Sequence, residues 1–458
     1  MNLTFYLSGL LSFFKDRRII ENIEHMIQKI IEKKTVRLFK VADDKKEYNR
    51  YKSLLDGSLK SVLNNEKISQ ALRENSVEAM SGQKQIILIH DPGDIRKKYS
   101  KELESIGKVL DLDKNVINGY YTFNTVAIDD NNKQLHLVDT KVYSNREPNF
   151  VSIDTLELYN KGVLQESEDP ELRERAETIK QLLETDDYIN VSRITKEQLE
   201  KTSQAFKQEQ PDAQITHILD AGFDNNDLFD YIDTELEDKF VIRLKLSRNS
   251  DETYLDDNGK EKYAKIIKKK FANKKCFSIQ KTQINGKIYQ QANCLIEYEN
   301  FSGPVDTVVR ITLYDRKRQK IFKNSMLLLT NLDVNTHELA HGIYLTYLKR
   351  SKIEGVFKFL KDVLGWEEFQ VRDFESITNI TARCFFIGGY FYEIESELIK
   401  DTTIQCICDL GGGKGKYTRY YFLQGLAKIL TYKAVEQFVE EPDIGYEQFE
   451  QMKNILIC

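Results

Sequence analysis

The sequence predicts an α/β protein: a mixed five-stranded sheet with flanking helices, preceded by a helical N-terminal domain and interrupted by a β-rich insertion. Three observations predict this fold. A short continuous apolar run at residues 86–89 is typical of a strand buried on both faces. Two longer strand-like segments follow it across a turn-rich stretch. A helical segment then separates these from two further short strands.

Composition is that of a soluble globular protein, with 41% apolar and 30% charged residues among 458. The net charge is -5, so any contact with nucleic acid has to come from local basic surfaces. Six cysteines form no CxxC pair, which indicates reduced intracellular thiols. The apolar first fourteen residues are too few to span a bilayer. They predict a buried helix, and the chain as a whole predicts a cytoplasmic protein that makes no membrane contact.

Residues 15–82 show helical periodicity, with an apolar face that includes Ile23, Ile27 and Ile30. Basic residues, among them Arg17, Arg18 and the pair at 33–34, flank that face. Residues 1–82 therefore form a predicted helical N-terminal domain. Its basic flank could contact DNA, although an ordinary solvated helix has the same pattern.

The first predicted strand, at residues 86–90, ends in Asp91-Pro92-Gly93-Asp94. Strands are also predicted at 117–128 and 135–143, separated by the turn-rich residues 129–132. Because short turns join these three strands, they suggest an antiparallel meander. A carboxylate at the end of a central strand, here Asp91, is well placed for function.

The region from about 154 to 212 is acidic and helical, which predicts a solvent-facing layer. A fourth strand at 215–219 is again followed by an aspartate, Asp220. A short helix at 226–233 and a fifth strand at 239–245 complete the unit. The element order is that of the ribonuclease H-like fold. In that fold the first strand, the end of the fourth and a late helix converge at one edge of the sheet.

A strand-rich insertion is predicted at 247–331, with Ile284-Asn285-Gly286 as a hairpin turn. Its opening is basic: residues 241–275 hold eleven Lys and Arg against five Asp and Glu. That local excess suits a phosphate backbone. The predicted divisions are therefore the N-terminal domain, a catalytic core in two parts, the insertion and a helical C-terminal segment: 1–82, 83–246, 247–331, 332–400 and 401–458.

A predicted helix at 347–361 places four polar side chains on one face. At about 100° per residue, they fall within a stripe roughly 60° wide; they are Tyr347, Arg350, Glu354 and Lys361. Arg and Lys bind phosphates, and a carboxylate between them suits a metal ion. Glu354 takes the third converging place in the fold, beside Asp91 and Asp220.

This helix resembles the Tyr-x2-Arg-x3-Glu-x6-Lys signature of DDE transposases of bacterial insertion sequences, in the group named for insertion sequence four. The stretches at 90–95, 117–120 and 218–224 are similar to the blocks around that family's first two catalytic aspartates. The resemblance covers about residues 85–392. One departure is Ser351, since the family usually has Trp after the signature Arg.

The resemblance implies a DNA transposase, an endonuclease that cleaves transposon ends and transfers the strand into target DNA. It implies Asp91, Asp220 and Glu354 as catalytic residues that hold two Mg²⁺, for which Mn²⁺ could substitute. Tyr347, Arg350 and Lys361 would contact DNA at the cut end. The partners would be terminal inverted repeats and target DNA in the bacterial nucleoid. A dimer would pair the two ends.

A second motif supports a different enzyme. His337, Glu338 and His341 form HExxH, two zinc ligands with a general base, and an acidic residue among 393–397 could be a third ligand. This zinc metallopeptidase alternative leaves Asp91, Asp220 and the predicted sheet order unused. A third alternative is a catalytically decayed DNA-binding relic, against which the intact triad argues.

Overall fold

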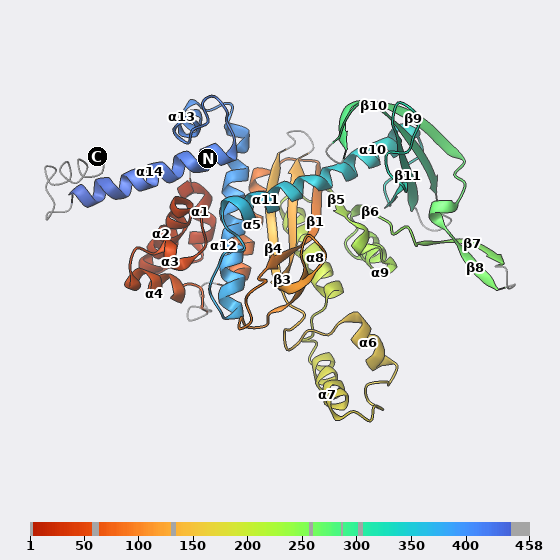
Figure 1. The fold of residues 1–458 in the computed structure, drawn as a ribbon, viewed down its shortest axis with the longest axis horizontal. Helices are drawn as coiled ribbons and strands as arrows, with labels where there is room; N and C mark the ends of the chain where they lie inside the picture. The colour runs from red at the N-terminus through yellow and green to blue at the C-terminus, as the bar shows by residue number, and fades with distance from the viewer. Residues whose placement is uncertain are drawn as a thin grey trace.

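The computed structural model describes residues 3–56, 64–129, 134–255, 260–284, 287–300 and 306–440. These residues form a mixed α/β structure in which helices cover a large mixed sheet (Figure 1). A helical N-terminal region lies on one side and a β-rich region on the other.

The N-terminal region is helical, as predicted. Its helices are α1 (Leu3–Ser12), α2 (Arg17–Lys33), α3 (Leu38–Val41), α4 (Lys45–Ser53) and α5 (Asn65–Ala79). The predicted buried helix at the start of the chain is confirmed, since Tyr6, Leu7 and Leu10 are buried. In α2 the Asp16 side chain caps the N-terminus, and the isoleucine face predicted from the sequence is buried. DNA contact by this region stays a prediction.

The five predicted core strands are present. They are β1 (Gln85–Arg96), β3 (Val116–Asp129), β4 (Leu135–Tyr143), β5 (Gln214–Leu219) and β6 (Lys239–Arg243). Their order is β4-β3-β1-β5-β6, with β3 antiparallel to β1 and β4, and β5 parallel to β1 and β6. A short strand not predicted from the sequence, β2 (Gly107–Leu110), pairs with the start of β3. The arrangement is consistent with a ribonuclease H-like fold.

The two faces of the central strand pack against different helices, because successive side chains point to opposite faces. Ile87 and Ile89 of β1 join a core cluster with α12 (Phe374–Glu393). Ile86 and Leu88 join a second cluster with Phe206 of α8 (Val191–Glu209). The continuous apolar run is thus explained by burial on both faces of the sheet.

The sheet is larger than the predicted five strands, because the insertion continues it. The described residues form a ten-stranded sheet in which β12 pairs antiparallel with β6. The added strands are β9 (Asn273–Ile284), β10 (Lys287–Asn300), β11 (Thr307–Tyr314) and β12 (Met326–Thr330). A separate hairpin, β7 (Asn249–Leu255) with β8 (Glu261–Lys265), was not predicted. The predicted turn at Asn285-Gly286 lies outside the described residues.

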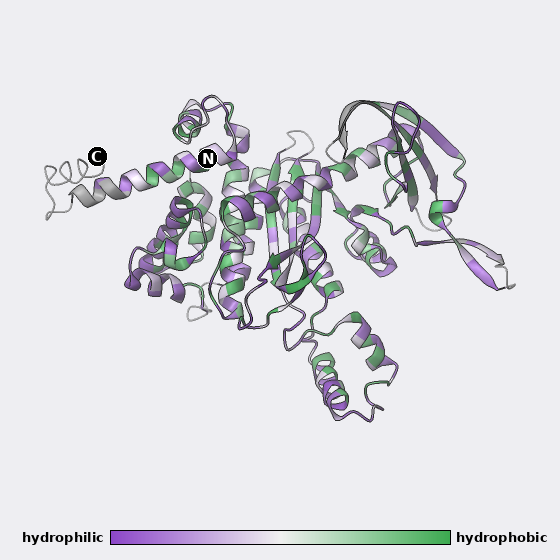
Figure 2. Ribbon diagram, viewed as in Figure 1, coloured by the Kyte–Doolittle hydropathy of each residue, from purple (hydrophilic) through white to green (hydrophobic). Residues whose placement is uncertain are grey.

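The acidic helical segment divides into two parts. Its last helix, α8, packs against the sheet, whereas α6 (Ile153–Asn160) and α7 (Pro170–Glu184) stand away from it (Figure 1). These two helices share a small core of their own that includes Leu164, Ala176 and Ile179. Figure 2 shows hydrophobic stretches on both of them. The predicted solvent-facing layer is therefore wrong for α8.

Beyond the insertion the chain is helical. The helices are α10 (His337–Leu348), η4 (Lys349–Ser351), α11 (Lys352–Val363), α12, η5 (Ile394–Glu397), α13 (Thr402–Leu410) and α14 (Arg419–Glu440). α10, η4 and α11 follow one another directly and cross the front of the sheet in Figure 1. Among the helices in the described ranges, none combines the length and apolar character needed to cross a bilayer. The domain limits at 82, 246, 331 and 400 stay predictions.

Candidate active site

Asp91 lies within β1, and the prediction that the strand ends there is wrong. β1 continues through Pro92 to Arg96 because its antiparallel partner β3 runs alongside over that whole length. Parallel pairing with β5 stops earlier, at Ile89. The Asp91 residue is 6% exposed. It is therefore a buried carboxylate just past the point where the two central strands separate.

Asp220 follows the last residue of β5, as predicted. The register pairs Ile89 of β1 with Ile218 of β5, so Asp91 and Asp220 each lie two residues further along adjacent parallel strands. One Asp220 carboxylate oxygen accepts a hydrogen bond of 2.7 Å from the backbone N–H of Gly222. That bond holds the turn after β5 and fixes Asp220 at the level of Asp91.

Glu354 reaches the same place from α11, and one guanidinium contacts all three carboxylates. Arg350 Nη2 lies 2.6 Å from Asp91 Oδ1 and 3.6 Å from Asp220 Oδ2. Its Nη1 lies 3.4 Å from Glu354 Oε1, an i,i+4 pair on the helix. Asp91, Asp220 and Glu354 are far apart in sequence, and the fold brings all three into contact with the Arg350 guanidinium.

The other two residues of the predicted stripe lie near this cluster. Tyr347 is buried, which raises the pKa of its phenol, and Arg350 and Asp220 are close enough to influence that pKa. Lys361 Nζ lies 2.9 Å from the backbone carbonyl of Asp94 and 2.8 Å from Glu367 Oε1. Lys361 therefore ties α11 to the second half of β1, beyond the three carboxylates.

Negative charge is only partly compensated at the cluster. Three carboxylates surround one guanidinium, and the buried Arg350 Nε has no hydrogen-bond partner within the part of the chain that the structure describes. Burial raises the pKa of Asp91 to about 6, and the nearby Asp220 and Glu354 add to the effect, although Arg350 opposes it. A raised carboxyl pKa beside two further acids is typical of a site that binds a cation.

A buried histidine pair joins the two strands that carry the aspartates. His90 Nε2 and His217 Nδ1 lie 2.9 Å apart, and His217 Nε2 lies 3.0 Å from Asp238 Oδ2. His90 follows Leu88 on the α8 face of β1, opposite to Asp91, and burial lowers its pKa well below the usual value. These histidines hold β1 against β5, which is a structural role.

Sequence reasoning missed one residue that supports the site. Asn124 of β3 is fully buried, and its side-chain amide donates to the backbone carbonyl of Asp91 at 3.3 Å. Its carbonyl oxygen accepts a hydrogen bond of 2.8 Å from the Thr140 hydroxyl on β4. A single Asn in a strand gives no signal of this kind, because the contact depends on the register between β1 and β3.

The HExxH residues lie on the first turns of α10 and contact the insertion. The His341 ring stacks on Phe277, with ring centroids 4.4 Å apart, and His337 meets Tyr298 edge-on at 5.3 Å. Glu338 forms an ion pair with Lys275. In the described part of the chain, no group of three or more His, Cys, Asp or Glu side chains is arranged to hold a metal ion. This applies to HExxH and to the Arg350 cluster alike.

The acidic residues that could have completed a zinc site have other partners. Glu393 Oε1 lies 2.7 Å from His136 Nδ1, and Glu395 forms an ion pair with Arg419. We expect the double variant His337→Ala/His341→Ala to contain the same amount of zinc as the wild type, measured by elemental analysis after purification. It should lose only the ring contacts with Phe277 and Tyr298, which together contribute about 2 kcal/mol to the free energy of unfolding. A stoichiometric zinc ion that the variant loses would contradict this.

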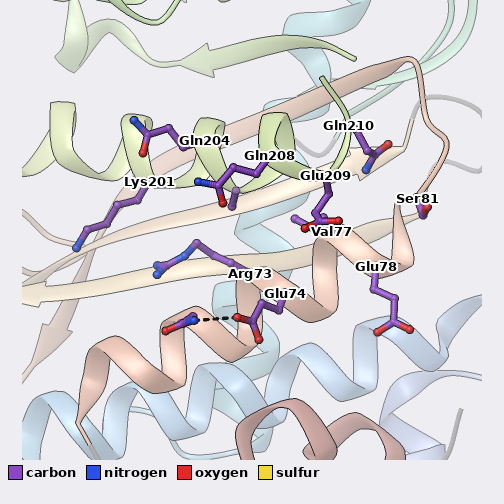
Figure 3. A pocket seen from close by; sticks show the side chains of 12 residues that line it. Arg73, Glu74, Val77, Glu78, Ser81, Lys201, Gln204, Gln208, Glu209 and Gln210 are labelled. Carbon is purple, nitrogen blue, oxygen red and sulfur yellow. Dashed lines mark hydrogen bonds between the residues drawn. The ribbon is translucent and has the colours of Figure 1, made fainter. Parts of the chain in front are cut away.

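A cavity of about 590 Å³ lies away from this site, between α5 and α8 (Figure 3). Its cations are already paired with acids. Arg73 pairs with the buried Asp139 and with Glu66, and Lys201 pairs with Glu66 at 3.0 Å. These pairs attach α5 to β4 and α8, so the charged lining of this groove has a structural explanation.

Comparison with known protein families matches a part of the chain that includes two of the three carboxylates. Residues 195–387 match a family model described as a transposase DDE domain. The match begins in α8, includes Asp220, the insertion and Glu354, and ends in α12, whereas Asp91 precedes it. No curated protein matches the chain. The match supports a DDE transposase, an enzyme of DNA transposition and recombination, in a family that typically binds DNA and divalent metal ions.

Proposed function

We propose that the protein cleaves DNA at the ends of a transposable element and joins the freed ends to target DNA. The observation that carries this proposal is the meeting of Asp91, Asp220 and Glu354 at one guanidinium. The Tyr-x2-Arg-x3-Glu-x6-Lys pattern at 347–361 supports placing it in the insertion-sequence-four-type group. The same pattern makes Tyr347, Arg350 and Lys361 the candidates for DNA contact.

The residues of the cluster fit a divalent cation by their chemistry. Carboxylate oxygens are the ligands that Mg²⁺ and Mn²⁺ prefer, and one guanidinium leaves two of the three negative charges uncompensated when all are ionised. Asp91, Asp220 and Glu354 would hold two Mg²⁺ or Mn²⁺. Such ions stabilise the charge that develops on a phosphoryl group during displacement. Their entry requires the Arg350 guanidinium to withdraw from Asp91, and Glu354, 65% exposed, has room to turn inward.

The remaining residues of the stripe would bind and orient the DNA strand. After the Arg350 side chain leaves the carboxylates, it stays near them because its backbone lies one helical turn before Glu354. There its guanidinium can hold a phosphate by two parallel hydrogen bonds. Lys361, which lies eleven residues further along the helical segment, would bind another phosphate of the strand as a point charge. The buried Tyr347 lies close to Arg350 and would orient its side chain.

One such site serves both steps. Hydrolysis at the end of the element and attack by the freed 3′-hydroxyl on target DNA are the same in-line displacement with different nucleophiles. Because two ends have to be joined, we propose a dimer on DNA. The basic residues at the opening of the insertion supply a surface for the phosphate backbone. In its run of three lysines, Lys268 and Lys270 are exposed, whereas Lys269 pairs with Glu252 and Glu299.

The test is cleavage of linear DNA that carries the terminal inverted repeats of the protein's own genomic element. We expect a new 3′-hydroxyl at the repeat boundary in Mg²⁺ or Mn²⁺, none in EDTA, and joined products when a target plasmid is added. A DNA of equal length with scrambled repeats is the control. Failure to bind or cut the repeats in either metal, by protein shown to be folded, would reject the proposal.

Metal affinity should depend on pH through Asp91. Its pKa is raised to about 6, so protonation of Asp91 stabilises the folded, metal-free protein. This contribution to stability is lost as pH rises through 6. Metal binding needs the ionised carboxylate, so metal affinity instead increases as pH rises through 6. We expect Mn²⁺ affinity, measured by calorimetry, to fall roughly fourfold from pH 7.5 to pH 5.5, as for competition by a single proton. In Asp91→Asn the affinity should be weak, with little change over that interval.

A further inference from the structure

Three adjacent strands carry charged residues in one row at the carboxylate cluster. The registers place Ile89 of β1, Ile218 of β5 and Val241 of β6 side by side, and all three join the core cluster on the α12 face of the sheet. Because every second side chain of a strand points to the same face, the residues two positions further along share that face. They are Asp91, Asp220 and Arg243. The row of the two aspartates therefore continues with an arginine.

Arg243 is an exposed cation with no acidic partner. It is the last residue of β6 and follows three buried residues. The ion pairs at this end of the sheet use Arg350 and Arg248, and none among the described residues joins Arg243 to a carboxylate. On the other side, the register pairs Arg243 with the apolar Leu328 of β12. The positive charge of Arg243 is therefore available to a ligand that reaches the site.

The Tyr347 phenol lies close to both this arginine and the cluster. Tyr347 belongs to α10, which packs against β6. Burial raises the pKa of the phenol, and the nearby positive charges of Arg350 and Arg243 oppose that rise. The carboxylate of Asp220 is close enough to add to it. Arg243 is therefore part of the surroundings of the candidate active site, although its strand lies beyond those of the two aspartates.

The position of Arg243 suits a phosphate beside the one that is cut. Adjacent strands lie about 4.8 Å apart, so the backbone of Arg243 is one such step beyond Asp220. A DNA strand whose phosphate sits at the three carboxylates would bring a neighbouring phosphate within reach of the long Arg243 side chain. A guanidinium binds a phosphate by two parallel hydrogen bonds, which fixes orientation as well as position.

We propose that Arg243 is a substrate-binding residue that holds the DNA phosphate next to the scissile one. This inference rests on the proposed function, because the scissile phosphate is defined by cleavage at the carboxylate cluster. Arg350 on η4 and Arg243 on β6 then hold one strand from two separate elements, with Tyr347 close to both. A strand held at two phosphates keeps the bond to be cut in line with the attacking group.

The test combines a variant with a change in the DNA. Single-turnover cleavage in Mn²⁺ is measured on terminal-repeat DNA, and on two DNAs with a neutral methylphosphonate 5′ or 3′ of the scissile phosphate. We expect Arg243→Gln to cut unmodified DNA about tenfold to a hundredfold more slowly, because a charge-assisted contact is lost. One of the modified DNAs should slow the wild type by a similar factor. On that DNA the variant should be no slower than the wild type, because the contact is already absent.

Three further measurements separate DNA contact from a structural role. Arg243→Lys should cut at an intermediate rate, because it keeps the charge without the planar fork. The Mn²⁺ affinity of Arg243→Gln, measured by calorimetry, should stay within about threefold of the wild-type value, because Arg243 forms no ion pair with the described carboxylates. Its melting temperature should also stay near that of the wild type. Arg173→Gln, an exposed arginine on α7, is the matched control and should cut like the wild type.

The outcomes distinguish this inference from the proposed function. Equal cleavage by the wild type and by folded Arg243→Gln overturns the inference alone. So does a loss in Arg243→Gln that adds in full to the loss on both methylphosphonate DNAs. A change in Mn²⁺ affinity of more than about threefold also overturns it, because Arg243 would then act through the carboxylates. If the wild type cuts no terminal-repeat DNA, the proposed function is rejected and this inference with it.

Discussion

Glu354→Gln should lower the rate of DNA end cleavage by at least roughly a thousandfold, whereas Glu338→Gln should leave it near the wild-type value. Glutamine keeps the shape of glutamate but cannot hold a divalent cation as a carboxylate does. Glu354 contacts Arg350 beside the two aspartates, whereas Glu338 forms an ion pair with Lys275 at an exposed position, where solvent screening keeps such a pair weak. The measurement is single-turnover cleavage of end-labelled DNA in Mn²⁺.

The two glutamates separate the two enzymes that the sequence suggests. A zinc peptidase built on His337 and His341 would need Glu338 as its base and would be indifferent to Glu354. Asp220→Asn and its control Asp227→Asn repeat the comparison in the segment after β5. Asp220 belongs to the carboxylate cluster, whereas Asp227 is exposed on α9 (Asn226–Asp230). Thermal melting of each variant checks that it is folded. Equal cleavage by Glu354→Gln, Asp220→Asn and their controls would remove the carboxylate cluster from the reaction.

Arg350→Met should bind Mn²⁺ at least about tenfold more tightly than the wild type, yet be less stable without metal by roughly 3 kcal/mol. The guanidinium contacts Asp91 at 2.6 Å and Asp220 at 3.6 Å, so an incoming cation has to compete with it. Methionine keeps an unbranched apolar stem like that of arginine but carries no charge. It leaves three carboxylates that repel one another until a metal ion arrives.

Calorimetry at pH 7.5 gives the affinity, and thermal melting with and without Mn²⁺ gives the stability. DNA cleavage by Arg350→Met should fall in spite of tighter metal binding, because the proposed phosphate contact is lost. Arg316→Met, an exposed arginine of the insertion, is the control for loss of a positive charge. Weaker or unchanged Mn²⁺ binding by Arg350→Met would show that the guanidinium does not occupy the place of a cation.

Much of the core was predictable because buried strands leave a strong pattern. The apolar run before Asp91, the two longer strands after it and the aspartate after β5 have the predicted positions. The convergence of Asp91 and Asp220 was expected from the ribonuclease H-like element order, and the register of the adjacent parallel strands β1 and β5 gives its physical cause. The helix with Glu354 was predictable from its 3.6-residue period, but the predicted single helix at 347–361 is interrupted by the 3₁₀ turn η4 between α10 and α11.

What could not be predicted depends on contacts between distant segments. The sequence Asp91-Pro92-Gly93-Asp94 has the composition of a turn, yet pairing with β3 keeps it extended. The weakly apolar β7 and β8 give little periodic signal, so their hairpin was missed. The Arg350 contact with Asp91 spans most of the chain and depends on a side-chain conformation. Spacing placed Arg350 on the correct face but could not indicate its partner.

The pairing of β12 with β6 has a consequence for protein engineering. Leu328, Leu329 and Thr330 cover the strand next to the one that carries Asp220. A shortened protein that lacked residues 247–331 would leave β6 as an open, apolar sheet edge, a template for self-association. The β-rich region therefore cannot be exchanged as a detachable cassette. A foreign DNA-contacting module inserted in its place would have to retain β12 as the strand that pairs with β6.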